Sequence, residues 1–372
     1  MKKIAYIELD THAEIALNFM ELMNDSKAFS VDYYFSEKIL RFFGFAQNNR
    51  LPENIKKATP ENLIQQLSTD NYQLIIIGTV HRYFNVFEKI AEKFNTSVIC
   101  HNLNFVKVSN FHLLSSVFKE DFKYRLKLLL KEGLLRKSKV YKKAKNLLVL
   151  DQTLKCNVIL NEAQHNQIKS ETLNEDYERS SGESFTFLPI FYTKFSEKPK
   201  NETYTIVIPG AVSQKRRDYE RVLKSIKIFH FPLEIIFLGK AQGKELEILQ
   251  NFEQSKPENI SIKYFKEKVP QDVFDDYMQK ADVLWCPIQQ ETEFFSQKEI
   301  YGFTKMSGNI GDAVKFGKLA VFPENYPSNY PFIIPEKGSL GDFLFTKKDV
   351  DFSEFSKEKV LQELEKTIFA LL

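Results

Sequence analysis

The chain has 372 residues, of which 43% are hydrophobic, and its formal net charge is only +3. This length suits two domains of ordinary size, and 13 glycines and 13 prolines are too few for a fibrous or disordered protein. The small net charge means that any anionic partner must meet a local basic patch. No apolar run reaches the ~18–20 residues that span a bilayer, and the opening MKKIAYIELD predicts a strand rather than a signal peptide.

The three cysteines are Cys100, Cys156 and Cys286, and their spacing matches no metal-binding pattern. Cys100 and Cys286 stand in apolar, strand-like runs, where a buried thiol is expected. This cysteine usage is typical of a reducing cytosol, so we expect a cytoplasmic protein.

Strands and helices alternate through the first half of the chain. Strands are expected at residues 3–9, 30–35, 72–78, 97–100, 146–150 and 185–190, and helices at 14–23, 37–43, 60–67, 83–94 and 154–161. Residues 48–59 predict a polar loop, and Pro60 is expected to begin a helix because its missing N–H costs nothing at the first helical position. The alternation predicts a parallel, doubly wound sheet.

Residues 111–145 depart from this alternation. Leucine and phenylalanine are interleaved there with lysine and arginine, and the basic side chains outnumber Glu120, Asp121 and Glu132. A basic amphipathic helix of this kind can lie on an anionic membrane, or it can be a core helix with a solvated basic face. We favour the membrane, which implies a peripheral position on the inner membrane face. We expect no nucleic acid partner, because no recognisable binding motif accompanies the charge.

The second half begins after a segment at residues 193–203 that is charged, contains a proline and has no periodicity, which is typical of a linker. The alternation then resumes, with strands expected at 204–209, 233–238, 260–265, 281–287 and 319–322 and helices at 218–229, 244–252, 272–280 and from 357 onward. We therefore expect domains at 1–195 and 196–355, and a C-terminal helix at 356–372 that packs back on the first domain.

The stretch 299–323, EIYGFTKMSGNIGDAVKFGKLAVFP, predicts a loop, a helix and a buried strand. Lys305, Ser307 and Gly308 stand where the loop enters the helix, and Gly317 is expected to end it. Small residues at a helix N-terminus expose backbone N–H groups and the positive end of the helix dipole, which suits a phosphate. The alternative is an ordinary strand–helix–strand connection with a glycine at each end.

Several motifs follow one another in the second half: Gly210, RRDY at 216–219, Leu238–Gly239, Val269, Phe274, ADV at 281–283, Pro287, EIYG at 299–302, Lys305, Asp312–Ala313 and Gly317–Lys318. In this order and spacing the second half resembles the donor-binding domain of GT-B fold glycosyltransferases that use sugar nucleotides, most of which are retaining. The resemblance implies an α/β protein with two Rossmann-like domains, whose parallel sheets face each other across a cleft. The first half would then be the acceptor-binding domain.

The resemblance also implies roles for acids in the second half. Asp312 matches the second acid of the family's paired-acid motif, which holds the hydroxyls of the donor ribose; a carboxylate suits two vicinal O–H donors. The first acid would fall at Thr304, which carries no carboxylate. Glu299 is the nearest preceding acid, and the resemblance gives it the contact with the sugar.

The donor diphosphate and base are implied to meet a second group of residues. Arg216 and Arg217 follow the first strand, where a guanidinium stays protonated and pairs bidentately with phosphate, and Gly210 lets the chain turn close to it. The alternative is that the two arginines begin a solvated helix and that Gly210 is an ordinary turn glycine. The same resemblance gives contacts with the diphosphate or the base to Lys305, Ser307, Gly308 and Val269.

Polar residues also follow strands in the first half. His101 ends a predicted strand, and the resemblance implies that it faces the donor sugar; it could equally be a half-buried histidine at a strand end. Asp10 and His12 follow the first strand, at the edge where α/β sheets bind ligands, and either could serve as a general base in an inverting reaction. His81 is a further candidate.

Together these features predict a bacterial, hexosyltransferase-like glycosyltransferase of surface polysaccharide synthesis, which moves a sugar from a nucleotide diphosphate sugar to a glycan or lipid-linked acceptor. We expect no metal cofactor, because arginine and lysine would balance the leaving-group charge and no convincing DxD pair is present. One alternative is a nucleotide-sugar epimerase or hydrolase, which would need several acids in the cleft. The other is a non-catalytic nucleotide-sugar-binding subunit, which the missing acid at Thr304 keeps open.

Overall fold

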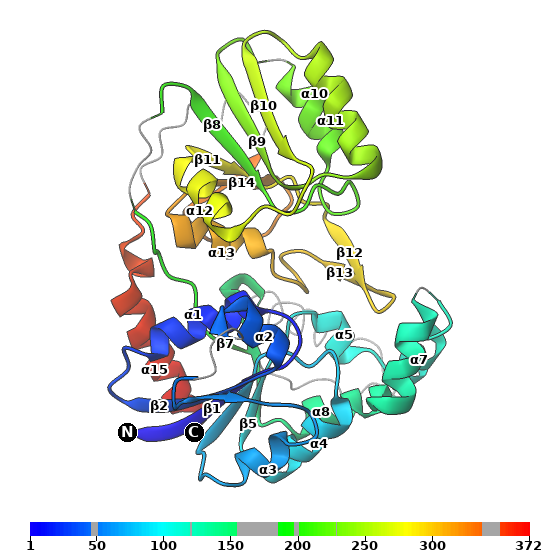
Figure 1. Cartoon of the computed structure of the whole chain (residues 1–372), viewed down its shortest axis with the longest axis vertical. Helices are drawn as coiled ribbons and strands as arrows, with labels where there is room; N and C mark the ends of the chain where they lie inside the picture. The colour runs from blue at the N-terminus through cyan, green and yellow to red at the C-terminus, as the bar shows by residue number, and fades with distance from the viewer. Residues whose placement is uncertain (46–50, 120, 155–184, 197–200, 228, 337–349) are drawn as a thin grey trace, which may run out of the picture.

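Two parallel sheets dominate the computed structural model, which describes residues 1–45, 51–119, 121–154, 185–196, 201–227, 229–336 and 350–372 (Figure 1). The first sheet contains β1 (Lys2–Glu8), β2 (Phe29–Phe35), β3 (Ile55–Lys57), β4 (Leu74–Ile77), β5 (Thr96–Ile99), β6 (Asn146–Val149) and β7 (Phe185–Phe187). Its spatial order is β3-β2-β1-β4-β5-β6-β7, and all of its described pairings are parallel.

Helices cover both faces of the first sheet, because its strands are apolar on both sides. In β1, Ala5 and Ile7 belong to one buried cluster, and Ile4 and Tyr6 belong to the other. The helices of this half are α1 (Ala13–Met23), α2 (Glu37–Phe42), α3 (Leu63–Leu67), α4 (Phe84–Lys93), α5 (Leu103–Lys107), α6 (Asn110–Ser116), α7 (Phe122–Lys131), the 3-10 turn η2 (Leu134–Arg136) and α8 (Lys137–Lys143).

The second sheet has the order β10-β9-β8-β11-β14-β15, and its described pairings are also parallel. Its strands are β8 (Tyr204–Pro209), β9 (Leu233–Lys240), β10 (Ile260–Phe265), β11 (Val283–Trp285), β14 (Ala320–Pro323) and β15 (Ile333–Glu336), and its helices are α10 (Tyr219–Ile226), α11 (Gly243–Ser255), α12 (Gln271–Lys280) and α13 (Gly308–Phe316). The predicted α/β architecture with two parallel sheets is confirmed.

A two-stranded antiparallel hairpin leaves the second sheet and extends toward the first. It consists of β12 (Glu291–Phe294) and β13 (Gln297–Ile300). In Figure 1 it spans the gap between the two halves and ends beside α5. The sequence analysis did not predict this hairpin.

The chain passes between the two halves twice, at neighbouring points. The N–H of Thr193, on the first passage, donates to the carbonyl of Phe355, on the second, at 2.8 Å. Residue 355 ends a 3-10 turn, η4 (Ser353–Phe355), and α15 (Lys357–Leu371) then returns to the first half. There α15 packs near α1, where Ser26 Oγ donates to Glu365 at 2.5 Å.

Some local predictions were wrong. The predicted loop at 48–59 contains β3, and α3 begins at Leu63 rather than Pro60, because the side chain of Asn62 accepts the N–H of Thr59 and holds a turn there. The basic segment is not one helix but α6, α7 and α8, separated by residues with positive φ, Asp121 at 54° and Gly133 at 74°. The predicted end of α13 at Gly317 is confirmed by its φ of 58°. Residues 155–161 of a predicted helix lie outside the described residues.

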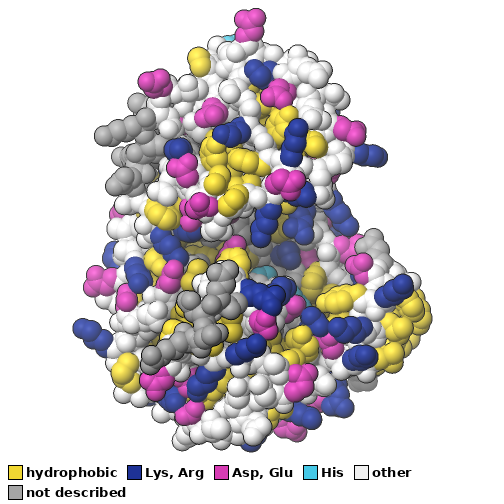
Figure 2. Space-filling model, viewed as in Figure 1, with side chains coloured by type: hydrophobic (Ala, Val, Ile, Leu, Met, Phe, Trp, Pro, Cys, Tyr) yellow, Lys and Arg dark blue, Asp and Glu magenta, His cyan; other side chains and the backbone are white. Residues whose placement is uncertain are grey.

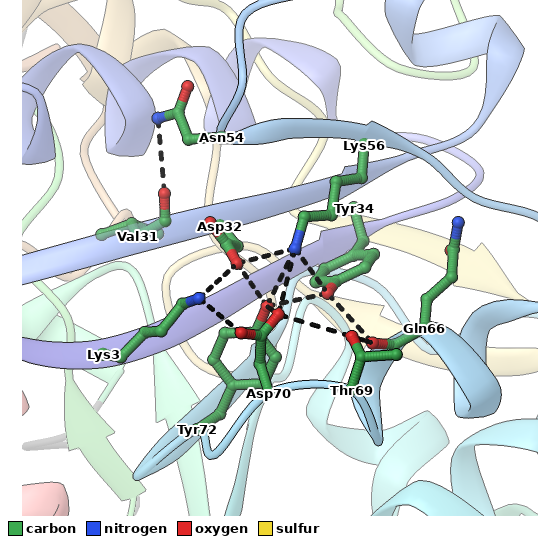
Figure 3. A network of polar contacts seen from close by, with 10 residues as sticks. All are labelled: Lys3, Val31, Asp32, Tyr34, Asn54, Lys56, Gln66, Thr69, Asp70 and Tyr72. Carbon is green, nitrogen blue, oxygen red and sulfur yellow. Dashed lines mark hydrogen bonds and ion pairs between the residues drawn. The ribbon is translucent and has the colours of Figure 1, made fainter.

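A partly buried polar network joins β1, β2, β3 and the turn before β4 (Figure 3). Asp32 accepts from Lys56 at 2.8 Å and lies 3.3 Å from the ammonium of Lys3. Asp70 accepts from Lys3 at 2.7 Å and from Lys56 at 3.3 Å, and the hydroxyl of Tyr72 contacts both carboxylates. The hydrogen bond from Lys3 lowers the pKa of Asp70 to about 2. The network therefore links three strands through charge-assisted hydrogen bonds.

We expect Lys56→Met to lower the free energy of unfolding by about 1.5–3 kcal/mol, because it removes the closer of the two cations beside Asp32 and leaves only Lys3 at 3.3 Å. Urea unfolding measures this loss. The matched control is Lys57→Met. Lys57 pairs with Glu37 at the surface, so this substitution should lower the free energy of unfolding by less than about 1 kcal/mol.

The stability of the network should also depend on pH. The pKa of the Asp70 carboxylate is lowered, so the stabilisation by this carboxylate is present above pH 4 and disappears as the pH falls toward 2. The difference in unfolding free energy between the wild type and Lys56→Met should therefore become smaller as the pH falls. Equal losses of stability in Lys56→Met and Lys57→Met at neutral pH would contradict the role of the network.

Candidate active site

Three histidines meet at the carboxyl edge of the first sheet. His12, His81 and His101 follow β1, β4 and β5, which are neighbours in the sheet, so the turns after them lie together. The rings of His12 and His101 stack with centroids 3.7 Å apart, and the ring of His81 lies 5.9 Å from each. We call these three side chains the histidine floor. Figure 2 shows a histidine within the hollow between the two lobes, surrounded by lysine and arginine side chains.

Burial keeps the histidine floor neutral at pH 7. It lowers the pKa of His101 to about 4, and it lowers the pKa values of His12 and His81 well below the usual value for histidine. The Nε2 of His101 contacts the carbonyl of Gly78 at 2.8 Å, so this nitrogen carries a proton. The floor thus presents neutral imidazoles rather than a cluster of positive charges.

Lys305 reaches the histidine floor from the second half of the chain. Its ammonium donates to Oδ1 of Asn102, and the amide nitrogen of Asn102 lies 3.4 Å from Nε2 of His81. Burial lowers the pKa of Lys305, and the charge of Lys305 in turn lowers the pKa values of the three histidines. The sequence analysis predicted that Lys305 lies at a helix N-terminus suited to a phosphate. In the structure, Lys305 also contacts the first domain.

Asp10 lies at the same sheet edge but has cationic neighbours. Its carboxylate is 3.7 Å from Arg82 and 3.6 Å from Lys38. Its backbone N–H donates to Glu8, a fully buried acid that the sequence analysis did not single out. Burial raises the pKa of Glu8 to about 7, and Thr79 donates to its carboxylate at 2.6 Å. An acid inside the apolar run YIELD was the signal that could have identified it.

Glu299 does not face open space, contrary to the contact with the sugar that the resemblance implied. Its side chain is buried, and its two carboxylate oxygens accept the N–H groups of Asn104 at 3.3 Å and Phe105 at 2.9 Å. These are the second and third residues of α5, so Glu299 supplies an N-terminal cap to a helix of the other half. Its carboxylate is already used in this contact.

The β12–β13 hairpin is fixed to the first half by more than Glu299. The ring of Phe294 lies 5.0 Å from the ring of Phe105 and 4.5 Å from the ring of His81. The N–H of Leu103 donates to the carbonyl of Thr304 at 2.9 Å, just after the hairpin. The hairpin and the loop after it therefore form one side of the candidate site.

The N-terminus of α13 forms the opposing surface, in the second half. Ser307 caps this helix, and Gly308 is exposed with open space where a Cβ would stand. The Nη2 of Arg217 donates to Oδ1 of Asn309 at 3.2 Å. A Cβ at Gly210, where φ is 100°, would lie 2.5 Å from the same guanidinium nitrogen, so only glycine allows this approach. The structure thus brings Gly210, Arg217, Ser307 and Gly308 together.

The remaining candidates lie around this helix end. Arg216 is exposed and close enough to Lys305 to lower the pKa of that lysine. Asp312 accepts from Asn309 at 3.0 Å, and burial raises the pKa of Asp312 to about 6. Glu14 of α1 raises it further, which indicates that Asp312 lies toward the first domain. Val269 is half-buried between β10 and α12 and packs against the buried cluster that contains Ile310 of α13.

An open hollow of about 420 Å³ lies beside the loop that carries Arg216 and Arg217. Its lining residues are Gln214, Lys215, Gln289, Gln290 and Glu291. Among the residues that the structure describes, no group of three or more histidine, cysteine or acidic side chains is arranged to hold a metal ion.

No protein-family model matches this sequence, and no curated protein matches it either. Among solved structures, HepE from Anabaena in complex with UDP aligns over 100% of both chains with a TM-score of 0.56 and 10% identity. The apo lipopolysaccharide outer core galactosyltransferase WaaB aligns over 100% of both chains with a TM-score of 0.54 and 13% identity. The chain has the GT-B glycosyltransferase fold. Identities this low establish the GT-B fold alone.

The GT-B fold does not decide the activity. The UDP-GlcNAc 2-epimerase of Methanocaldococcus jannaschii also aligns with this chain, over 99% of both chains, with a TM-score of 0.50 and 10% identity. The choice between these activities has to come from the side chains around the histidine floor and the N-terminus of α13.

Proposed function

We propose that this GT-B protein is a metal-independent glycosyltransferase that moves a sugar from a nucleotide diphosphate sugar to a glycan or lipid-linked acceptor in polysaccharide synthesis. The observation that carries the proposal is the position of Arg217 and Gly210 at the exposed N-terminus of α13. The N–H of the exposed Gly308, a helix dipole and a guanidinium meet there, which is the chemistry that binds a diphosphate.

The donor would lie between the two halves. Its diphosphate would contact Arg217 and the first residues of α13, and Asp312, one turn further along this helix, would meet the ribose hydroxyls. The solved HepE structure contains UDP, which supports a nucleotide in this fold. As the bond to the sugar breaks, negative charge grows on the departing diphosphate, and Arg217 would stabilise it.

The acceptor would approach the histidine floor. His12 is neutral at pH 7, and its side chain makes no hydrogen bond to a described residue, so it could take the proton of an attacking hydroxyl. Asp10 is the second candidate base, although Arg82 and Lys38 lie close to it. The epimerase alternative would need several acids here, but Glu8 is buried and Glu299 caps α5. A transferase therefore fits these side chains better.

The test combines donor binding with product analysis. A thermal-shift screen with UDP, GDP, ADP and CMP identifies the nucleotide, and the corresponding sugar nucleotides are then incubated with glycan and lipid-linked acceptors. We expect a glycosylated acceptor by mass spectrometry, with a rate unchanged by EDTA. An epimerised sugar nucleotide, or free nucleotide without a glycosylated acceptor, would contradict the proposal. Binding without any reaction would favour a nucleotide-sugar-binding subunit, and a rate abolished by EDTA would contradict metal independence.

The membrane contact that we propose is confined to part of the basic segment. We define the α6–α7 surface by its exposed apolar residues Phe111, Phe118, Phe122 and Leu130 and its exposed lysines Lys119, Lys123, Lys127 and Lys131. Phe111, Phe118 and Leu130 are 79%, 73% and 73% exposed, which is unusual for large apolar side chains on a folded protein. Figure 2 shows hydrophobic side chains at this edge of the lower lobe, where Figure 1 places α7.

Other lysines of the segment 111–145 are engaged within the protein. Lys137 is buried, and its ammonium donates to the carbonyls of Phe105, Val106 and Val108 at 2.7–2.8 Å. Lys143 donates to Glu88 at 3.2 Å. The membrane proposal therefore rests on the α6–α7 surface rather than on α8. None of the helices in the described ranges is long and apolar enough to cross a bilayer.

Replacing Lys123 and Lys131 with glutamine should weaken binding to vesicles of phosphatidylglycerol and phosphatidylcholine by roughly tenfold or more, because each lysine near an anionic surface contributes about 1 kcal/mol. Sedimentation with the vesicles measures the change. The matched control replaces Lys224 and Lys244, two exposed lysines of the second half, and should bind as the wild type does. Equal binding by the first variant and the wild type would rule out this membrane contact.

A further inference from the structure

The histidine floor lies in an environment without a free acid. The charged group that lowers the pKa values of all three rings is Lys305, and no carboxylate raises any of them. The nearby acids have other partners: Asp10 is close to Arg82 and Lys38, Glu8 accepts from Thr79, Glu14 lies near Asp312, and Glu299 caps α5. Lys305 itself makes no ion pair within 4 Å to a described residue, and the acid whose charge raises its pKa is Glu299.

The hydrogen bonds around the floor leave donors without an acceptor. Lys305 donates to Oδ1 of Asn102, so the amide nitrogen of Asn102 faces Nε2 of His81 and can only donate to it. This assigns the proton of His81 to Nδ1. The Nε2–H of His101 donates to the carbonyl of Gly78. The ring of His12 has no hydrogen bond to a described residue. The N–H groups of His12 and His81 and two N–H bonds of the Lys305 ammonium are therefore available.

From this geometry we propose that the histidine floor and Lys305 form a subsite for a second anionic group, a carboxylate or phosphate attached to a sugar, distinct from the diphosphate of the donor. The proposal rests on the proposed function, because it places this group on the transferred sugar or on the acceptor. A carboxylate or phosphate accepts several N–H bonds at once, which matches the four N–H bonds that His12, His81 and Lys305 offer. It would also add a direct partner for the half-buried charge of Lys305, which feels the charge of Glu299 but forms no ion pair with it.

The donor diphosphate alone does not account for the histidine floor. Arg217 and the N-terminus of α13 offer the diphosphate a site in the second half, and that site contains no histidine among the described residues. The three histidines belong to the first half, which would hold the acceptor and contact the transferred sugar. Two different anionic groups therefore have two separate sets of donors.

Occupation of the subsite should be coupled to proton uptake. A bound anion favours the charged form of an imidazole and raises its pKa. Because His12 and His101 stack at 3.7 Å, two neighbouring positive charges would repel, so the three rings together should take up about one proton. The other rings remain neutral, and a neutral imidazole is still present to accept the proton of the acceptor hydroxyl.

The first experiment follows the histidine Cε1–H signals by NMR at pH 6.5 while D-glucuronate, glucose 1-phosphate or glucose is added to the full chain. We expect one of the two anions to shift the signals of the floor toward their protonated positions and glucose to leave them unchanged. A response to glucuronate assigns a sugar carboxylate, and a response to glucose 1-phosphate assigns a phosphate. The shift should be lost in His12→Gln and kept in His230→Gln, which changes an exposed histidine far from the cleft. The absence of a shift with either anion overturns the proposal.

The second experiment separates this proposal from the donor assignment. Calorimetry with UDP-glucose and UDP-glucuronic acid, in buffers of different ionisation enthalpy, measures affinity and proton uptake together. For a sugar carboxylate we expect about tenfold tighter binding of UDP-glucuronic acid, with uptake of about one proton that UDP-glucose does not cause. If neither nucleotide binds while a free anion still shifts the rings, the UDP assignment fails and the subsite stands. If both bind equally and no anion shifts the rings, the subsite fails and donor binding stands.

Discussion

Replacing Arg217 with alanine is expected to lower turnover by about 10²–10³-fold while the protein stays folded. The Arg217 guanidinium contacts Asn309 at the N-terminus of α13 and approaches Gly210 closely, so it is fixed where the departing diphosphate would gain charge. A fixed cation stabilises that charge more than the ground state, and its loss should therefore reduce kcat more than it raises KM.

Initial rates of glycosyl transfer measure this effect, and circular dichroism checks the fold. The matched control is Arg41→Ala, because Arg41 is exposed on α2 and forms an ion pair with Glu37 of the same helix. Arg41→Ala should keep the wild-type rate. Wild-type turnover by folded Arg217→Ala would exclude this arginine from the donor site and remove the main support for the proposed function.

Replacing Glu299 with alanine is expected to lower the free energy of unfolding by about 3 kcal/mol and to detach the β12–β13 hairpin from α5. The N–H groups of Asn104 and Phe105 would lose their carboxylate acceptor, whose side chain is fully buried. Because Lys305 follows the hairpin by a few residues, its position against Asn102 would also be lost. We therefore expect kcat to fall as well.

Hydrogen exchange of the backbone N–H groups at the start of α5 measures the detachment directly. The control is Glu291→Ala, since Glu291 lies in the same hairpin but pairs with Lys298 at the surface, and it should cost below about 1 kcal/mol. Glu299→Gln keeps the shape of the side chain and can accept one N–H. The exchange rate of the N–H groups at the start of α5 should therefore lie between the rates in Glu299→Ala and in Glu291→Ala. Unchanged protection of α5 in Glu299→Ala would show that the hairpin is held by its other contacts.

Elements with a buried face could be predicted from the sequence because burial produces periodicity. Strand β8 has the expected bounds, and α13 ends at the expected Gly317, since both carry strong apolar patterns bounded by glycine or proline. The β12–β13 hairpin could not be predicted, because ETEF and QKEI are mostly polar and the aromatic residues at its turn pack into the core of the other half. Its stability comes from contacts with the other half of the chain, which no local pattern records.

Some features of the candidate site could likewise be predicted from the sequence, and others could not. That His12, His81 and His101 follow strands could be predicted, but their stacking depends on the strand order β1-β4-β5, which brings the turns together. The role of Glu299 could not be predicted, because its partners are backbone N–H groups about 195 residues away in the chain. A carboxylate that caps a distant helix looks, in sequence, the same as one that binds a sugar.

The two passages of the chain between the lobes lie side by side at residues 193 and 355, while the hairpin joins the lobes again beside α5. The lobes therefore share a covalent pivot and a separate contact that has to break before they can move apart. If the proposed transferase encloses its product between the lobes, that product would leave no faster than this contact opens, and the opening rate would then limit kcat. Loosening the hairpin slightly, as in Glu299→Gln, would then speed product release even as it weakens the grip on the donor.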